Sequence, residues 1–232
     1  MDTSMRVARV AAPLRQQITE NLRRAITEGR FLPGQRLVER ELCELTGVSR
    51  TSIREALRQL ESEGLIKIIP HRGPVVATVS LEEAAEIYEI RAVLEALAGR
   101  LFAERATTEQ RKELQAVFRE LEATLKRGDA SEGLRVKSRF YEILMRGSGN
   151  AALMTFLSSI QGRITMLRAT SLSHPGRAAK TLQEIRILMG AIKARDGDAA
   201  WQACLDHVRS AQAVAMGILR KGTDDTPTRS AL

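Results

Sequence analysis

The chain of 232 residues is poor in the residues on which most enzyme chemistry and extracellular stability depend. It has two cysteines, Cys43 and Cys204, three histidines, His71, His174 and His207, and an aromatic content of only 3%. Two cysteines without a C-x-x-C spacing form neither a disulfide framework nor a zinc site, so we expect reduced thiols packed in helices. The sequence also lacks a nucleophile elbow, a paired-carboxylate motif and a phosphate-binding glycine loop. An all-helical enzyme is therefore the weaker interpretation, and we expect no catalytic residues.

Long apolar runs are absent as well. No stretch approaches the roughly 18 apolar residues of a membrane span, and the segment from Met1 to Arg6 lacks the apolar part of a signal peptide. Hydrophobic residues make up 44% of the chain and charged residues 28%, which is typical of a soluble globular protein. We therefore expect a cytoplasmic protein of one or two domains with no membrane partner.

Acidic residues are fewer than basic residues, with 28 Asp and Glu against 36 Lys and Arg. The formal net charge is +8 and the isoelectric point is about 10.1. The excess of lysine and arginine is denser before Val79 than after it. This balance favours an anionic partner such as a nucleic acid.

The segment 38–60 predicts two short helices around a tight turn. The apolar residues of the first helix fall on one stripe: Val38, Leu42 and Leu45. Gly47 supplies a position where this helix can stop. Either Ser49 or Ser52 can cap the second helix, and Ser52 would form a capping box with Glu55.

The second of these helices places apolar and cationic residues on different faces. Its buried face is predicted to hold Ile53, Leu57 and Leu60. Arg50, Arg54 and Arg58 are spaced by four residues and share another face, with Thr51 and Ser52 near the helix N-terminus. Guanidinium groups suit guanine edges in the DNA major groove, whereas the simpler interpretation is an ordinary solvated face.

The segments around the helix pair decide between these interpretations. After a flexible arm, residues 1–12, an earlier helix is predicted from one apolar stripe: Leu14, Ile18, Leu22 and Ile26. After the pair, two β-branched runs, 65–69 and 75–79, flank a Pro/Gly turn and predict a hairpin. Three helices and a hairpin over residues 13–79 have the order of a winged helix-turn-helix domain. His71, Arg72 and Gly73 would lie at the wing tip, where a cation can reach phosphate or the minor groove.

Residues 80–222 predict an antiparallel bundle of about six helices, followed by a polar tail at 223–232. Caps and glycines separate segments with helical apolar spacing. In the first segment the predicted buried residues are Leu81, Ala84, Ile87, Leu94, Leu97 and Leu101. The fold class is therefore mainly α, with a winged domain before an all-α bundle.

The first domain resembles the winged-helix domain of GntR-family bacterial transcription regulators. The resemblance runs from about Leu14 to Val79 and is carried by the motifs at 29–37, 39–42, 47–57, 60–65 and 71–73. The family implies operator contacts at the matching positions: Arg40, Arg50, Thr51, Ser52, Arg54, His71 and Gly73.

The bundle resembles the ligand-binding domain of the FadR-type (FCD) subfamily, and six helices would be similar to its shorter, VanR-like branch. Many members of this subfamily hold a divalent metal with an Asp and three His residues. The matching positions here are Lys137, Tyr141, Ile185 and His207. An ammonium group and an aliphatic chain cannot act as ligands, and one imidazole cannot hold a metal alone, so we expect no metal.

The substitution at Lys137 suggests how an effector could bind instead. If the metal serves partly to bind a carboxylate, the ammonium group of Lys137 can replace its charge, with Tyr141 and His207 as hydrogen-bond donors and Arg163 opposite. The alternative is that Lys137 reaches solvent and that the pocket is vestigial.

Together these patterns predict a transcription regulator, with repression the commoner outcome in this family. We expect a homodimer on a near-palindromic operator and a small carboxylate effector in the bundle. The alternative is an architectural DNA-binding dimer that has no effector.

Overall fold

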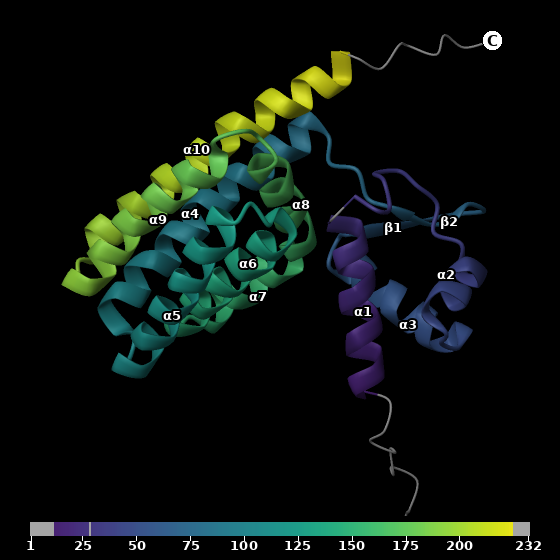
Figure 1. Ribbon diagram of the computed structural model, residues 1–232, viewed down its shortest axis with the longest axis horizontal. Coiled ribbons are helices and arrows are strands. Elements are labelled where there is room, and N and C mark those ends of the chain that lie inside the picture. Colours follow the sequence, from purple (N-terminus) through teal and green to yellow (C-terminus); the bar gives the residue numbers. More distant parts are fainter. Residues whose placement is uncertain (1–11, 28, 225–232) are drawn as a thin grey trace, which may run out of the picture. The chain divides into compact units, whose positions relative to one another are not determined.

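The computed structural model describes residues 12–27 and 29–224. They form two compact units whose boundary in the sequence lies between Thr78 and Val79 (Figure 1). The predicted arm and tail lie outside the described residues, except for Ala12, Thr223 and Asp224.

The first unit contains three helices followed by a hairpin, as predicted. Its elements are α1 (Ala12–Thr27), α2 (Glu39–Thr46), α3 (Arg50–Ser62), β1 (Ile66–Ile69) and β2 (Gly73–Val76). Both α1 and α2 pack against α3. The core between them consists of apolar residues from the predicted stripes: Ile18, Leu22, Ile26, Leu42, Ile53, Leu57 and Leu60.

Three positions in those stripes are not buried: Val38, the N-cap of α2, is half-buried, and Leu14 and Leu45 are exposed. Leu14 is 47% exposed and Leu45 is 73% exposed. Because α2 has only eight residues, Leu42 is the residue that it buries, and Leu45 in its last turn is left outside the core. Leu14 and Leu45 instead line a surface cavity of about 620 Å³ between α1 and α2.

The turn between α2 and α3 has the predicted glycine and one of the two predicted caps. Gly47 adopts a left-handed conformation with φ of 70°, and its N–H donates to the carbonyl oxygen of Cys43 at 2.8 Å. The side chain of Ser49 accepts a hydrogen bond from the N–H of Ser52 at 3.2 Å. Ser49 is therefore the N-cap, and α3 begins at Arg50.

The hairpin is tighter than the sequence predicted. β1 and β2 pair antiparallel with Ile69 opposite Gly73, so the second strand starts before residue 75 and ends at Val76. Arg36 forms an additional bridge with Val75, which ties the segment before α2 to the wing.

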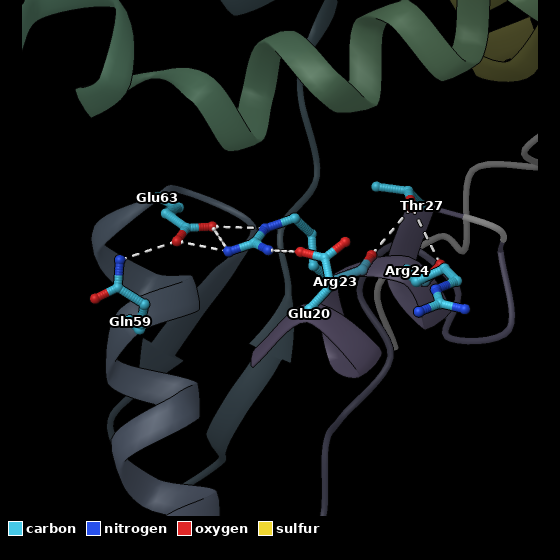
Figure 2. A network of polar contacts seen from close by, with 6 residues as sticks. All are labelled: Glu20, Arg23, Arg24, Thr27, Gln59 and Glu63. Carbon is cyan, nitrogen blue, oxygen red and sulfur yellow. Dashed lines mark hydrogen bonds and ion pairs between the residues drawn. The ribbon is translucent and has the colours of Figure 1, made fainter. Parts of the chain in front are cut away.

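An ion pair joins α1 to the C-terminal end of α3 (Figure 2). The guanidinium group of Arg23 donates to both carboxylate oxygens of Glu63, with nitrogen–oxygen distances of 2.8–3.0 Å. Gln59 donates to the same carboxylate at 2.9 Å, and Glu20 also accepts from Arg23. This network holds one end of α3 and leaves its N-terminal end exposed.

The described part of the second unit contains seven helices. They are α4 (Leu81–Arg105), α5 (Thr108–Lys126), α6 (Ala130–Gly147), α7 (Ala151–Ser159), α8 (Gln161–Leu172), α9 (Arg177–Ala194) and α10 (Gly197–Asp224). The sequence predicted about six because 151–172 has continuous apolar spacing. Ile160, with φ of −116° and ψ of 10°, interrupts this segment and separates α7 from α8.

Small residues bring α4 and α10 close together along the bundle (Figure 1). A Cβ atom at Gly99 would lie 2.6 Å from the sulfur of Cys204 and 3.2 Å from the carbonyl oxygen of Ala200. A residue larger than glycine therefore does not fit at position 99 without a shift of its neighbours. Among the described helices, none combines the length and the apolar character needed to cross a lipid bilayer.

We expect Arg23→Ala to lower the free energy of unfolding of the first unit by about 1 kcal/mol, because it removes a partly buried bidentate pair. The neighbouring variant Arg24→Ala is the control, since the side chain of Arg24 is not part of this pair (Figure 2). Urea denaturation of both variants measures the difference. Equal stability of the two variants would contradict the anchoring role of Arg23.

Candidate functional site

Two arginines project together from the first turns of α3. The side chains of Arg50 and Arg54 are 63% and 58% exposed. Thr51 between them is exposed, and the first turn of α3 contains no acidic residue. Its N–H groups and cations therefore form a surface that favours anions.

Glu39 at the start of α2 holds these guanidinium groups beside one another. Arg54 Nε donates to both oxygens of Glu39 at 2.9 and 3.0 Å, and Arg50 Nε lies 3.9 Å from the same carboxylate. The pairs are exposed, so they contribute little stability and can exchange for phosphate or base contacts. The arginines are thus ordered at the surface and are not sequestered in the core.

The remaining predicted residues of this surface have different environments. Arg40 is exposed and lies 3.8 Å from Glu44 on its own helix. The hydroxyl of Ser52 lies 3.0 Å from that of Ser49, so it is engaged in the cap.

The wing tip is a tight turn with left-handed residues. His71 has φ of 61° and Gly73 has φ of 82°, a conformation that glycine adopts without strain. His71 and Arg72 are exposed. Arg72 Nη2 donates to the carbonyl oxygen of Gly34, a neutral partner, at 3.3 Å.

A second group of polar residues lies inside the bundle, where eight side chains form a buried cluster. Five helices contribute to this cluster: Arg91 and Glu95 from α4, Lys137 and Tyr141 from α6, Arg168 from α8, Arg177 and Glu184 from α9, and His207 from α10. Each is at most 8% exposed. Four basic side chains thus surround two carboxylates in the core, which leaves an excess of positive charge.

Glu95 joins two of the arginines. Its Oε1 accepts from Arg91 Nε at 2.8 Å and from Arg168 Nη2 at 2.7 Å. The guanidinium carbon of Arg168 lies 4.2 Å from the centroid of the Tyr141 ring, a cation–π contact. Burial alone would raise the pKa of Glu95, but the two guanidinium groups lower it to about 2, so the carboxylate is ionised.

Glu184 forms the second half of the cluster. Its Oε2 accepts from Arg177 Nη1 at 2.9 Å and lies 2.6 Å from Nδ1 of His207. Burial opposes ionisation here too, but the hydrogen bond from His207 and the charge of Arg177 lower the pKa of Glu184 to about 2. Burial and the charge of Lys137 lower the pKa of His207 to about 3, against the effect of Glu184, so the imidazole is neutral.

Lys137 lies among these groups without a counter-ion of its own. It is 1% exposed, and among the described residues it makes no hydrogen bond or ion pair. Burial lowers its pKa well below the ordinary value, and the charges of Arg91, Arg168 and Arg177 lower it further. The predicted alternative, in which this side chain reaches solvent, does not hold because the residue is 1% exposed.

Several polar atoms of the cluster lack partners among the described residues. These atoms are Arg91 Nη1, Arg168 Nε, Arg168 Nη1, Tyr141 Oη and His207 Nε2. Buried polar groups need hydrogen-bond partners, so the cluster is a candidate binding site.

The cluster also differs from the predicted effector-binding set. Lys137, Tyr141 and His207 belong to it, but Arg163 does not: its side chain is 34% exposed and pairs with Glu83 at 3.1 Å. Arg168, further along α8, supplies the guanidinium group instead.

The sequence analysis did not predict Arg91 and Glu95 as members of the cluster, because it assigned the wrong face of the middle of α4 to the core. The predicted stripe included Leu94 and Leu97, which are only half-buried, whereas Arg91 and Glu95 face the core. A sequence signal was present, because Arg91 and Glu95 are four residues apart and lie in step with the buried Tyr88.

The donor set does not fit the divalent metal that the subfamily resemblance implies. Lys137, Tyr141 and His207 lie in the cluster, and the fourth position, Ile185, is a buried aliphatic residue. Glu184 contacts Nδ1 of His207 and so is engaged on the other side of the ring. No group of three or more His, Cys, Asp or Glu side chains suited to a metal occurs in the described ranges.

Comparison with known proteins identifies the family of each unit. Residues 14–76 match the model of "Bacterial regulatory proteins, gntR family", and residues 86–210 match that of the FCD domain. The chain is 33% identical over 196 residues to the HTH-type transcriptional regulator YdhC of Bacillus subtilis (strain 168), covering 84% of this chain and 88% of YdhC. It is 26% identical over 212 residues to the HTH-type transcriptional repressor RspR of Escherichia coli (strain K12), covering 91% of this chain and 93% of RspR.

A solved structure has the same fold over most of its length. E. coli McbR/YncC superposes with a TM-score of 0.75 at 25% sequence identity, covering 90% of this chain and 98% of McbR. The chain therefore belongs to the GntR family of bacterial regulatory proteins, and its second unit carries an FCD domain.

Proposed function

We propose that this transcription regulator, acting in the cytoplasm, binds a near-palindromic operator through α3 and the wing. The residues that would contact DNA are Arg40, Arg50, Thr51, Ser52, Arg54, His71, Arg72 and Gly73. The observation that carries this proposal is the pair of exposed guanidinium groups of Arg50 and Arg54 at the start of α3. Arginine can bind guanine O6 and N7 bidentately, and Nη atoms remain available on both side chains after their Nε contacts with Glu39.

We further propose that the buried cluster binds a small carboxylate effector. Arg91 and Arg168 keep unpaired N–H groups after their contacts with Glu95, and the buried amine of Lys137 would gain a counter-ion that favours its protonated form. A carboxylate would satisfy these donors and offset the excess charge. This cluster favours an effector-controlled regulator over an architectural DNA-binding protein, because dimerisation alone needs no buried excess of cations.

Dimerisation is proposed to use the outer face of α4. Ile90 and Val93 are 55% and 52% exposed, and with the half-buried Leu94 and Leu97 they form an apolar stripe at helical spacing. Acidic residues precede the stripe and Arg100 follows it. Two antiparallel copies of α4 would therefore bring opposite charges together around an apolar centre.

In this mechanism α4 links the two events. Its inner face carries Arg91 and Glu95, which would contact the effector, and its outer face carries the proposed dimer stripe. A ligand that moves α4 would change the disposition of the two winged domains and so the affinity for the operator. Repression is proposed for this chain because RspR is a repressor.

We expect Arg50→Ala and Arg54→Ala each to weaken specific operator binding by about 1–3 kcal/mol. Fluorescence anisotropy with DNA from the region upstream of the protein's own gene measures the loss. Arg105→Ala, which removes an exposed charge from the second unit, is the control and should bind as the parent does. Unchanged affinity in both α3 variants would refute the assignment of the recognition helix.

We expect Lys137→Met to raise the melting temperature of the ligand-free protein, because a buried amine without a partner is replaced by an apolar side chain of similar length. The same variant should lose the thermal shift produced by the most effective acid in a screen of small organic acids. Lys126→Met, at an exposed position of α5, should change neither quantity. A full response to the acid in Lys137→Met would contradict the proposed effector site.

We expect Val93→Arg to convert the dimer into a monomer, because it places a cation at the centre of the apolar stripe. Light scattering coupled to size-exclusion chromatography measures the molar mass. Ile187→Arg, at a position of α9 that is 66% exposed, is the matched control. If Ile187→Arg dissociates the protein and Val93→Arg does not, the interface lies elsewhere.

A further inference from the structure

The imidazole of His207 is oriented by a carboxylate, and this contact defines which nitrogen carries the proton. Nδ1 lies 2.6 Å from Oε2 of Glu184, and a carboxylate can only accept a hydrogen bond. Nδ1 must therefore carry the hydrogen. In the neutral ring Nε2 then has a free lone pair and acts as an acceptor.

One buried acceptor remains without a donor. His207 Nε2 has no hydrogen-bond partner among the described residues, and His207 is only 2% exposed. An unsatisfied acceptor in the core costs free energy unless a ligand donates to it. The pKa of about 3 for His207, caused first by burial, means that protonation of Nε2 does not remove this requirement at neutral pH.

Unpaired donors occur in the same cluster. Arg91 Nη1, Arg168 Nε and Arg168 Nη1 can donate to an anion. The Tyr141 ring connects the two sides, since its centroid lies 4.2 Å from the guanidinium carbon of Arg168 and 6.3 Å from the centre of the His207 ring. A ligand that meets both the donors and the acceptor would therefore lie beside the Tyr141 ring.

A simple carboxylate satisfies only half of this arrangement. Its oxygens accept hydrogen bonds from the arginines, but it has nothing to donate to His207. We propose that the effector is a hydroxy acid, whose carboxylate binds Arg91 and Arg168 and whose hydroxyl donates to Nε2 of His207. This inference rests on the proposed effector site and specifies the class of ligand that it takes.

An amino acid would also offer a donor, but its charge is unsuitable. The cluster already holds Arg91, Arg168, Arg177 and Lys137 around two carboxylates that are both engaged. An additional ammonium group would be repelled in this low-dielectric environment. A neutral hydroxyl supplies the donor without that cost.

Two matched sets of acids test the proposal in the full-length protein. The first set is malate, succinate and aspartate, and the second is lactate, propionate and alanine. In each set the same carboxylate skeleton carries a hydroxyl, a hydrogen or an ammonium group. Isothermal titration calorimetry should give binding roughly tenfold tighter for the hydroxy acid than for the unsubstituted acid of at least one set, as one added hydrogen bond implies.

Two substitutions of His207 separate its nitrogens. In His207→Asn the amide can occupy the place of Nδ1 and still donate to Glu184, but the acceptor at Nε2 is deleted. In His207→Gln the amide oxygen can occupy the place of Nε2. The preference for the hydroxy acid should disappear in His207→Asn and persist in His207→Gln, while His174→Asn, at an exposed histidine, should behave as the parent does.

The outcomes distinguish this inference from the proposed function. Equal binding of the hydroxy acid and the unsubstituted acid, or of the amino acid and the hydroxy acid, overturns the inference and leaves a carboxylate site in place. Equal preference in His207→Asn and His207→Gln, whether kept or lost, overturns the assignment to Nε2. If no acid of either set binds, the carboxylate effector itself is contradicted.

Discussion

Burial of like charges is the constraint on which the second unit depends. Four basic side chains are enclosed by five helices with only Glu95 and Glu184 as counter-ions. Each carboxylate already accepts from two groups, so no acidic side chain of the cluster remains for Lys137. Removing these charges from water has a cost in free energy, and an anion in the proposed effector site would offset it.

In the first unit, by contrast, Arg23, Arg50 and Arg54 each have an acidic partner and none of them is fully buried. Arg23 is satisfied by Glu63 at the end of α3, which fixes the helix against α1. Arg50 and Arg54 share a single carboxylate at the surface and remain hydrated. Their pairing with Glu39 orders the guanidinium groups at low cost, so a stronger anion can replace it. In the first unit, exposure to solvent thus separates the structural role of Arg23 from the proposed DNA-binding role of Arg50 and Arg54.

Helix α4 combines three requirements in one segment. Gly99 permits close contact with α10, Arg91 and Glu95 face the cluster, and Val93 faces outward. Since successive residues of a helix point in different directions, 25 residues can serve the packing, the proposed effector and the proposed dimer at once. This arrangement explains why a single stripe of apolar residues describes α4 poorly.

The sequence by itself determined the elements of the winged domain and its exposed arginines. Local signals were sufficient there, because Gly47, Ser49 and the spacing of Ile53, Leu57 and Leu60 act within one or two helical turns. It also identified Lys137, Tyr141 and His207 as an unusual set. Only the tertiary structure decided that Arg91, Glu95, Arg168, Arg177 and Glu184 surround them while Arg163 lies outside. Contacts such as that between Glu95 and Arg168, 73 positions apart, depend on how five helices are rotated about their axes, and local spacing does not specify that rotation.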